Sequence, residues 1–509
     1  MNGSGIDFVV VGDICQTPSI DDLAILTNTA LAVGSDGSIV WQCPAEDVSD
    51  IVEAHAAQGR LQRLSKGQFL TPGFIDTHIH ASQHSYAGTG MDKPLMEWLD
   101  AYTFPVERQF AHLPTAEVHS LYRRAVRRTL RNGTTTAVYF ATADRQASEA
   151  LADVCAEEGQ RAFVGKISMD RHCPPGYCET TEKSLEETAR FIESFRQRPS
   201  IVQPVVTPRF IPTCSDELLA GLGALVREHG CHVQSHMSES IDEMQFVEAI
   251  HQLKDDHHKH NPYPPCPTDA EIFDRHGLLT DRCIMAHAIY LSEGDVERLR
   301  ARGTAIAHCP LSNFYFAGGL LPVRSLLRSG VRVGLGTDVA GGYSPSMINA
   351  MQHAVTASRA LSIQQHHERH RLAGVKPWEP FPAGSSDTTS PALDWVNALY
   401  LATRGGAEAL NMGKQLGLLA EGYRFDAVLW DVTIGDNIDF TGSESRREQL
   451  EKLMHLGDDR NIACVWVDGQ VSCRRRDRPA QADCKARARD SNSVSWRADN
   501  RSAHRQMGA

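Results

Sequence analysis

Several features that mark other protein classes are missing from this 509-residue sequence. Its 13 cysteines stand singly, with no Cys-x-x-Cys pair, and their number is odd. This distribution predicts free, mostly buried thiols in a reducing compartment, not a disulfide framework or a zinc ribbon. No apolar run approaches the roughly 18 residues that a membrane span requires. The N-terminus lacks the basic start and apolar stretch of a secretory signal, so we expect a cytosolic protein.

Acidic residues outnumber basic ones before the C-terminal tail, and basic residues outnumber acidic ones within it. The formal net charge is −12. From Arg474 onward there are 10 Lys and Arg against 4 Asp and Glu, which leaves 41 against 59, or −18, in the preceding residues. An acidic body repels phosphates, which argues against nucleic acid as a partner. Residues 474–509 are charged and poor in apolar side chains, and we expect a disordered basic tail there.

Strand-like segments lie at both ends of the chain. Near the N-terminus they cover 7–12 and 30–41, with a turn at Asp36-Gly37. Near the C-terminus they cover 425–431 and 462–473, with a turn at Asp468-Gly469. We therefore predict a small β-sandwich domain built from residues 1–70 and 415–473, with residues 71–414 forming a different domain between its halves.

The middle of the chain alternates short apolar runs with amphipathic stretches, a pattern typical of βα units and a parallel sheet. The amphipathic stretches include 116–131, 185–196, 216–229 and 291–302. With the strand that ends at His80 there are about eight strands, which favours a closed (β/α)₈ TIM-like barrel of the α/β class. The other strand candidates are 135–140, 162–167, 201–206, 231–236, 283–287, 304–308 and 331–336.

Two polar segments, 251–268 and 364–394, are rich in histidine or proline. A metal cluster is one interpretation of their histidines, but no apolar framework would hold them in place. We therefore expect solvated surface loops. The histidines are His257, His258, His260, His366, His367 and His370.

The most informative motif contains His78 and His80, which lie two residues apart at the end of an apolar run. Alternation along a strand points both imidazoles to one side and Thr77 to the other. Two imidazoles on one face form half of a tetrahedral zinc site. Two hydrogen-bonded structural histidines at a strand end are the alternative.

Further candidate ligands end other predicted barrel strands. They are His236, His287 and Asp338. Each alone fits a structural role, such as a histidine bonded to a carbonyl or an aspartate that caps a helix. Their shared position favours chemistry, because active sites of (β/α)₈ barrels form at the carboxyl ends of the strands.

The chain resembles the metal-dependent amidohydrolase superfamily and, within it, the guanine deaminases. The superfamily motif Pro-Gly-x-x-Asp-x-His-x-His is present at 72–80. The narrower resemblance covers roughly residues 65–470. It rests on His-Ala-Ser-Gln at 80–83, Trp-Leu-x-x-Tyr-Thr-Phe-Pro-x-Glu at 98–107, Thr-Pro-Arg-Phe at 207–210, Ser-His-x-Ser-Glu at 235–239, Ala-His-Cys-Pro-x-Ser-Asn at 307–313, Gly-Thr-Asp-Val-Ala-Gly-Gly at 336–342 and Leu-Gly-Asp-Asp-Arg-Asn-Ile at 456–462.

The resemblance implies one Zn²⁺ per subunit, bound by His78, His80, His236 and Asp338, with a position left for water. Zinc lowers the pKa of bound water from 15.7 to about 7. The implied catalytic residues are Glu239 as proton shuttle, His287 beside the metal, and Asp338 as acceptor of the water proton. The implied substrate contacts are Gln83, Arg209, Phe210, Glu239 and Asp338.

The implied reaction is hydrolysis of guanine to xanthine and ammonia in purine catabolism or salvage, by a homodimer. An amide and a guanidinium can read the edge of a base, and an aromatic ring can stack on it. Two alternatives stay open. The substrate could be another aminated heterocycle of the triazine, pterin or cytosine type. The chain could also be a non-enzymatic barrel, although such relatives typically lose metal ligands that are all present here.

Overall fold

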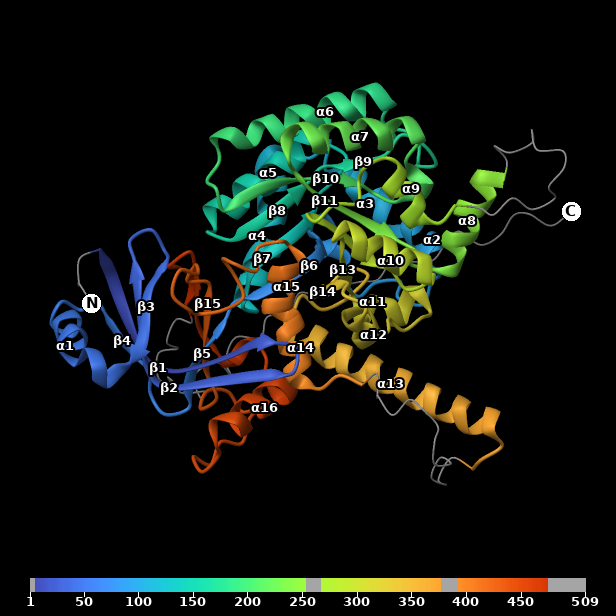
Figure 1. Ribbon diagram of the computed structural model, residues 1–509. Coiled ribbons are helices and arrows are strands. Elements are labelled where there is room, and N and C mark those ends of the chain that lie inside the picture. The colour runs from blue at the N-terminus through green and yellow to red at the C-terminus, as the bar shows by residue number, and fades with distance from the viewer. Residues whose placement is uncertain (1–4, 253–266, 377–391, 475–509) are drawn as a thin grey trace, which may run out of the picture. The chain divides into compact units, whose positions relative to one another are not determined.

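The computed structural model describes residues 5–252, 267–376 and 392–474 (Figure 1). The predicted disordered tail lies outside these residues, except for Arg474. So do His257, His258 and His260 of the first polar segment. Two sheets organise the described chain, one from its middle and one from its two ends.

The central sheet contains eight parallel strands, arranged in sequence order as in a TIM barrel. Most of their residues are buried on both faces, which is why they read as continuous apolar runs in the sequence. The strands are β6 (Phe74–His80), β7 (Thr134–Phe140), β8 (Arg161–Gly165), β10 (Val202–Pro208), β11 (His232–Met237), β12 (Cys283–His287), β13 (Ala305–His308) and β14 (Arg332–Leu335); β9 (Ile167–Ser168) adds a short pairing with β10.

Main-chain hydrogen bonds close the barrel where the segment after β14 meets β6. The amide of Asp338 donates to the carbonyl of His78 (2.9 Å), and the amide of His80 donates to the carbonyl of Val339 (2.8 Å). The Thr77 hydroxyl donates to the carbonyl of Leu335 (3.0 Å). Thr77 thus faces the seam, which leaves its two histidine neighbours facing the opposite side, as predicted.

Helices follow the barrel strands and cover the sheet (Figure 1). The predicted helical segments agree with the structure to within a few residues, because capping residues mark their ends. Ser215 caps the start of α7, and Gly230 ends it in the left-handed conformation. The longer helices of this region are α4 (Thr115–Arg131), α5 (Arg145–Glu157), α6 (Thr181–Ser194), α7 (Asp216–His229), α8 (Ile241–Gln252), α10 (Glu293–Arg302), α13 (Met347–Ala373) and α14 (Trp395–Ala402).

Shorter helices connect or follow these elements. They are α2 (Leu95–Trp98), α3 (Phe104–Gln109), α9 (Asp269–Arg275), α11 (Pro310–Ser312), α12 (Val323–Arg328) and α15 (Arg404–Ala409).

The second sheet joins the two ends of the chain, as predicted. Its eight strands run in the order β17-β16-β15-β5-β1-β2-β3, with β4 beside β1. The antiparallel pair β15 and β5 connects the halves, and Ala427 lies opposite Pro72. The strands are β1 (Ile6–Ser19), β2 (Asp22–Gly34), β3 (Ile39–Pro44), β4 (Leu61–Arg63), β5 (Gln68–Pro72), β15 (Ala427–Asp431), β16 (Ile462–Val467) and β17 (Gln470–Arg474); helices α1 (Ser49–Ala57) and α16 (Arg446–Leu456) belong to the same ends.

A close approach explains the glycine between β5 and β6. A Cβ atom on Gly73 would lie 2.1 Å from the Thr135 hydroxyl of β7. Only glycine allows the chain to pass from the terminal sheet into the first barrel strand at this distance.

The second polar segment was predicted wrongly as a loop over its first ten residues. These continue α13 to Ala373, so that His366, His367 and His370 lie on a helix. Apolar residues near the start of α13, such as Met347 and Met351, anchor the helix, and its polar end simply continues the same turns. Residues 377–391 lie outside the described part.

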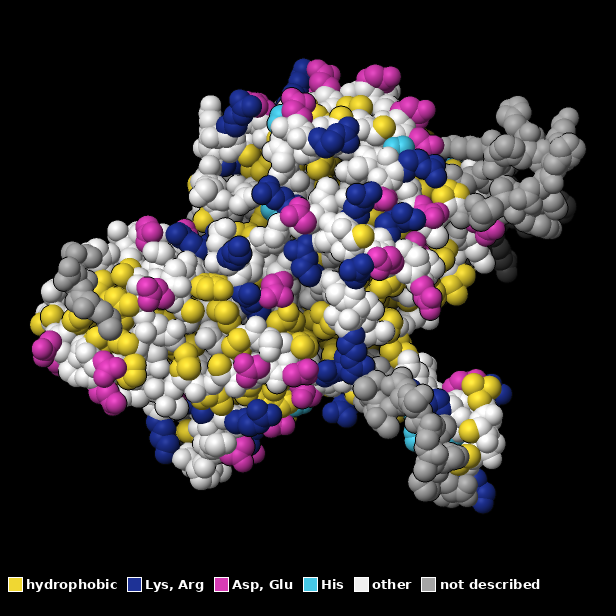
Figure 2. All heavy atoms as spheres, viewed as in Figure 1, with side chains coloured by type: hydrophobic (Ala, Val, Ile, Leu, Met, Phe, Trp, Pro, Cys, Tyr) yellow, Lys and Arg dark blue, Asp and Glu magenta, His cyan; other side chains and the backbone are white. Residues whose placement is uncertain are grey.

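Acidic and basic side chains are interspersed over the barrel helices on the face drawn in Figure 2. Among the described residues, no helix is both long enough and apolar enough to cross a bilayer.

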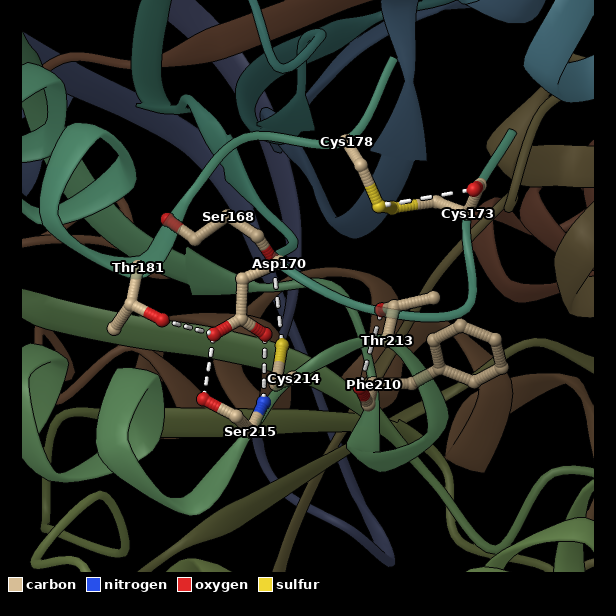
Figure 3. The surroundings of a disulfide bond; sticks show 9 residues. All are labelled: Ser168, Asp170, Cys173, Cys178, Thr181, Phe210, Thr213, Cys214 and Ser215. Carbon is tan, nitrogen blue, oxygen red and sulfur yellow. Dashed lines mark hydrogen bonds between the residues drawn. A yellow bond between two sulfur atoms is a disulfide. The ribbon is translucent and has the colours of Figure 1, made fainter. Parts of the chain in front are cut away.

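The prediction of free cysteines needs one correction. Cys173 and Cys178 form a disulfide in the loop between β9 and α6 (Figure 3). Their spacing of five residues hid the pair, but Pro174, Pro175 and Gly176 turn the chain and bring the two Cα atoms to 5.5 Å. Nine other cysteines of the described residues are free, and seven of these are buried.

Candidate metal centre and base-binding cleft

Three histidines converge at the carboxyl ends of β6 and β11. Their ring nitrogens form a buried group in which His78, His80 and His236 each offer one atom within 4.8 Å of the others. The Nε2 atoms of His80 and His236 are 3.2 Å apart. Parallel strands end at one side of the barrel, which is why residues 156 positions apart meet here.

Asp338 brings a carboxylate to the same group from the segment after β14. Its Oδ1 lies 3.1 Å from Nε2 of His78 and 3.4 Å from Nε2 of His80. Burial raises the pKa of Asp338, but the imidazoles of His78, His80 and His287 together outweigh this and hold the pKa well below its ordinary value. The carboxyl group is therefore ionised, the form that binds a cation.

The donor set fits a bound metal ion. Nε2 of His78 is buried and has no hydrogen-bond partner among the described residues. Nδ1 of His236 lies 2.7 Å from the carbonyl of Arg209, which fixes the ring and turns Nε2 towards the group. Burial lowers the pKa of His80 to about 4, which keeps that imidazole neutral and able to bind metal. Three imidazoles and one carboxylate are ligands that zinc accepts.

His287 and Glu239 lie beside this group. Nε2 of His287 is 3.5 Å from Oε1 of Glu239 and 3.7 Å from Oδ2 of Asp338. Its Nδ1 is 2.9 Å from the side-chain oxygen of Asn313, which orients the ring. Burial, followed by the charge of Asp338, raises the pKa of Glu239 to about 8. A carboxyl group that keeps its proton at neutral pH can act as a general acid.

Backbone strain concentrates at this site. Ser238, His287 and Asp338 have φ values of 46°, 67° and 49°, in the left-handed region that non-glycine residues seldom adopt. Such strain persists only where surrounding contacts hold it, and it is common at functional sites.

A cleft opens above the histidines and contains about 400 Å³ of space, part of it open to solvent. Gln83, Arg209, Phe210, Glu239 and Asp338 all line it. The remaining lining residues include an apolar wall of Leu95, Trp98, Leu99 and Phe316. The structure thus gathers all nine residues predicted for the site in one place, while their roles stay predictions.

Sequence reasoning missed several residues of this region. Trp98 packs on Phe316 (ring centroids 4.8 Å apart), and both line the cleft. Cys309 lies near His78, His287 and Asp338, but burial raises the pKa of its thiol well above the ordinary value. Trp98 belongs to the motif at 98–107 and Cys309 to the motif at 307–313, but neither motif indicates which of its side chains face the cleft.

Glu107 was also missed as a site residue. It is fully buried beside Gln83 and Arg209 and forms an ion pair with the latter. It ends the string at 98–107, but a glutamate on a short helix gives no local signal of a buried partner 102 residues away.

A metal-compatible centre at the carboxyl end of a (β/α)₈ barrel is the arrangement of a metal-dependent barrel enzyme. The amidohydrolase family model matches residues 69–374 and 382–472. Members of that family are metal-dependent.

Individual relatives narrow the class. Human guanine deaminase is 40% identical over 457 residues, which cover 88% of this chain and 92% of the relative. The probable guanine deaminase of Schizosaccharomyces pombe is 38% identical over 481 residues, covering 92% and 84%. Guanine deaminase from C. acetobutylicum, solved with guanine bound in its active site, superposes with a TM-score of 0.76 at 31% identity, covering 91% and 99%. The chain belongs to the amidohydrolase family and, within it, groups with the guanine deaminases.

Proposed function

We propose that this protein catalyses the hydrolytic deamination of guanine to xanthine and ammonia. One observation carries the proposal. The five side chains expected to bind the base and move its protons line a single cleft, and that cleft ends at the metal-compatible centre. The guanine-bound relative supports the choice of substrate.

We infer that His78, His80, His236 and Asp338 hold one zinc ion per subunit. A zinc ion bound there would supply hydroxide near neutral pH by lowering the pKa of water. We do not assign Cys309 as a ligand, because its Sγ atom, protonated as a thiol, lies 3.5 Å from the carbonyl of Ala307.

Glu239 and Asp338 divide the proton transfers because their environments push their pKa values apart. Asp338 is ionised and accepts the proton of the attacking water. Glu239 holds a proton at neutral pH, which it gives to the ring nitrogen next to C2. It then takes the proton of the hydroxyl group formed at C2 and passes it to the leaving amine, and the proton held by Asp338 restores Glu239 for the next turnover. His287 lies within 4 Å of both carboxyl groups and orients them.

Gln83, Arg209 and Phe210 select the base. The Arg209 guanidinium donates to O6 and N7, and the Gln83 amide offers both a donor and an acceptor. Phe210 supplies an aromatic face at the wall of the cleft. A base with another pattern of donors and acceptors would leave buried polar groups unpaired, and the cleft would bind that base more weakly.

The test is an ultraviolet assay of guanine beside adenine, cytosine and melamine, with metal analysis of the same sample. Loss of guanine absorbance with about one zinc per chain is the expected result. Protein that is inert towards guanine after zinc is supplied would refute the proposal. Full guanine affinity in an Arg209→Ala variant would favour a triazine, pterin or cytosine substrate instead.

The setting of the enzyme is also a proposal. We expect a cytosolic homodimer that acts in purine catabolism or salvage and has neither nucleic acid nor a membrane as a partner. We further propose that residues 1–70 with 415–473 form one domain and 71–414 the catalytic domain.

A further inference from the structure

Glu107 of α3 accepts four hydrogen bonds in the interior of the protein. Its Oε2 accepts from Nη1 of Arg209 and from the Tyr177 hydroxyl, both at 2.6 Å. Its Oε1 accepts from Nε2 of Gln83 at 2.9 Å and from Nη2 of Arg209 at 3.3 Å. Glu107 is 1% exposed and is not among the residues that line the cleft. It therefore stands behind the two side chains assigned to the base.

These bonds fix the direction of both side chains. The Gln83 amide gives Nε2 to Glu107, while its Oε1 accepts from the amide of Ala340 (3.3 Å). One N–H and one lone pair of Gln83 remain for a ligand. The Arg209 guanidinium lies over the ring of Phe104 at 5.0 Å, so α3 holds it both by charge and by stacking.

Glu107 also cancels the charge of Arg209. Burial raises the pKa of Glu107, but the Arg209 guanidinium, together with His80 and the Tyr177 hydroxyl, overcomes this and holds the pKa below its ordinary value. Both groups are therefore ionised, and together they are neutral. The cleft then presents the N–H groups of Arg209 without a net positive charge that would draw an anion.

Tyr177, which donates a hydrogen bond to Glu107, lies in a loop that is held by a disulfide and by hydrogen bonds at its base. It lies between Cys173 and Cys178, whose disulfide closes the loop (Figure 3). At the base of the same loop, Asp170 accepts hydrogen bonds from Thr181 of α6 and from Ser215, which caps α7.

We infer that Glu107 is a positioning residue for substrate selection, which orients Gln83 and Arg209 and makes the cleft favour a neutral purine over a purine anion. The inference rests on the proposed function only in taking Gln83 and Arg209 as the contacts of the base. It extends that function by giving the charge state of the preferred ligand.

The test compares Glu107→Gln and Tyr177→Phe with wild-type zinc enzyme. Tyr86→Phe is the matched control, because it removes a half-buried tyrosine hydroxyl that bonds Thr103 and not Glu107. For Glu107→Gln we expect KM for guanine to rise about tenfold or more while kcat changes less than about threefold, since ground-state and transition-state binding are lost together. For Tyr177→Phe we expect KM for guanine to rise about threefold. For the Tyr86→Phe control we expect KM to stay unchanged.

Inhibition by xanthine separates positioning from a structural role. Xanthine loses a ring proton in mildly alkaline solution, so its binding at pH 9 and pH 6 compares the anion with the neutral base. Glu107→Gln leaves the Arg209 charge uncompensated, and we expect the pH 9 to pH 6 binding ratio to rise about tenfold over wild type. A variant that merely distorts the cleft would weaken both forms alike.

The outcomes are distinct. Wild-type enzyme without guanine turnover would defeat the proposed function. Wild-type turnover with an unchanged KM and xanthine ratio in Glu107→Gln would defeat this inference alone. If Glu107→Gln does not fold, a KM for Tyr177→Phe equal to that of Tyr86→Phe would defeat it, and the expected threefold rise would support it.

Discussion

Asp76 of β6 and Thr337 after β14 are joined by two hydrogen bonds across the seam that closes the barrel. The amide of Thr337 donates to Oδ1 of Asp76 (3.0 Å), and its hydroxyl donates to Oδ2 (2.5 Å). The amide of His78 also donates to Asp76 (3.2 Å). One buried carboxyl group therefore holds together the two segments that carry His78 and Asp338, from opposite ends of the barrel sequence.

Replacing Asp76 by alanine should loosen the metal centre as well as the fold. It leaves buried donors of Thr337 and His78 without an acceptor, at a cost of roughly 1–3 kcal/mol each. We expect a lower midpoint of thermal unfolding and less than one zinc per chain, with a smaller loss in Asp76→Asn, which keeps one acceptor. Wild-type unfolding and zinc content in Asp76→Ala would show that the seam does not depend on this contact.

Removing a proposed ligand should remove the metal. We expect His236→Ala to purify with little zinc and to lose guanine turnover, because three ligands bind zinc much less tightly than four. His112→Ala, at an exposed position, is the control and should keep its zinc. Elemental analysis after dialysis against a chelator gives the result, and a His236→Ala sample with full zinc would exclude this residue from the site.

Glu239→Gln should affect chemistry and not metal binding. The amide cannot donate and accept the transferred proton, and such general acid–base groups contribute typically about 10²- to 10⁴-fold to the rate. We therefore expect kcat to fall by about that factor while zinc content stays at the wild-type level. A variant that retains more than a tenth of the wild-type kcat would assign the proton transfer to another group.

Asp269 predicts a pH dependence of stability. The pKa of Asp269 is raised from an ordinary 3.8 to about 6, and burial is the largest cause of this shift. The folded state thus keeps a proton that the unfolded state releases between about pH 4 and pH 6. The stabilisation is complete below pH 4 and is lost as pH rises to 6, at roughly 1.4 kcal/mol per pH unit.

An Asp269→Asn variant, which stays neutral, isolates this effect. Measured by thermal unfolding, the stability of the wild type relative to the variant should decline from pH 4 to pH 6 and stay level above it. Asp50→Asn, at an exposed position, controls for the change in charge. A difference that does not vary with pH in this range would contradict the prediction.

The disulfide should contribute modestly to stability. Closing a loop of six residues restricts the unfolded chain by about 2 kcal/mol in the chain-entropy model. We expect the double variant Cys173→Ser, Cys178→Ser to unfold a few degrees earlier without reductant and to match the wild type in its presence. If mass spectrometry of unreduced protein finds both thiols open to alkylation, the bond does not form in solution.

The barrel was predictable because its signals are local. Buried parallel strands leave short apolar runs, such as 283–287, and capping residues such as Ser215 and Gly230 mark where helices begin and end. The end of α13 was missed because its residues are mostly polar and leave no apolar periodicity to reveal a helix. The disulfide was missed for another reason. The odd number of cysteines and the lack of Cys-x-x-Cys pairs describe the chain as a whole, and they do not show that one particular pair is brought together by a turn.

The sequence by itself determined the candidates of the site. The His78-x-His80 spacing places two imidazoles on one face, and strand-end positions bring His236, His287 and Asp338 to one rim of the barrel. Their types and order also carry the family resemblance, because each lies in a short motif that can be read without knowing its neighbours in space.

Only the tertiary structure decided what surrounds those candidates. The ion pair of Glu107 with Arg209, and the contact of Asp76 with Thr337, join residues 102 and 261 positions apart. A buried carboxyl group acquires its role and its pKa from the donors packed against it, and those donors come from separate strands and loops. Local sequence does not encode that packing, which exists only once the barrel has closed.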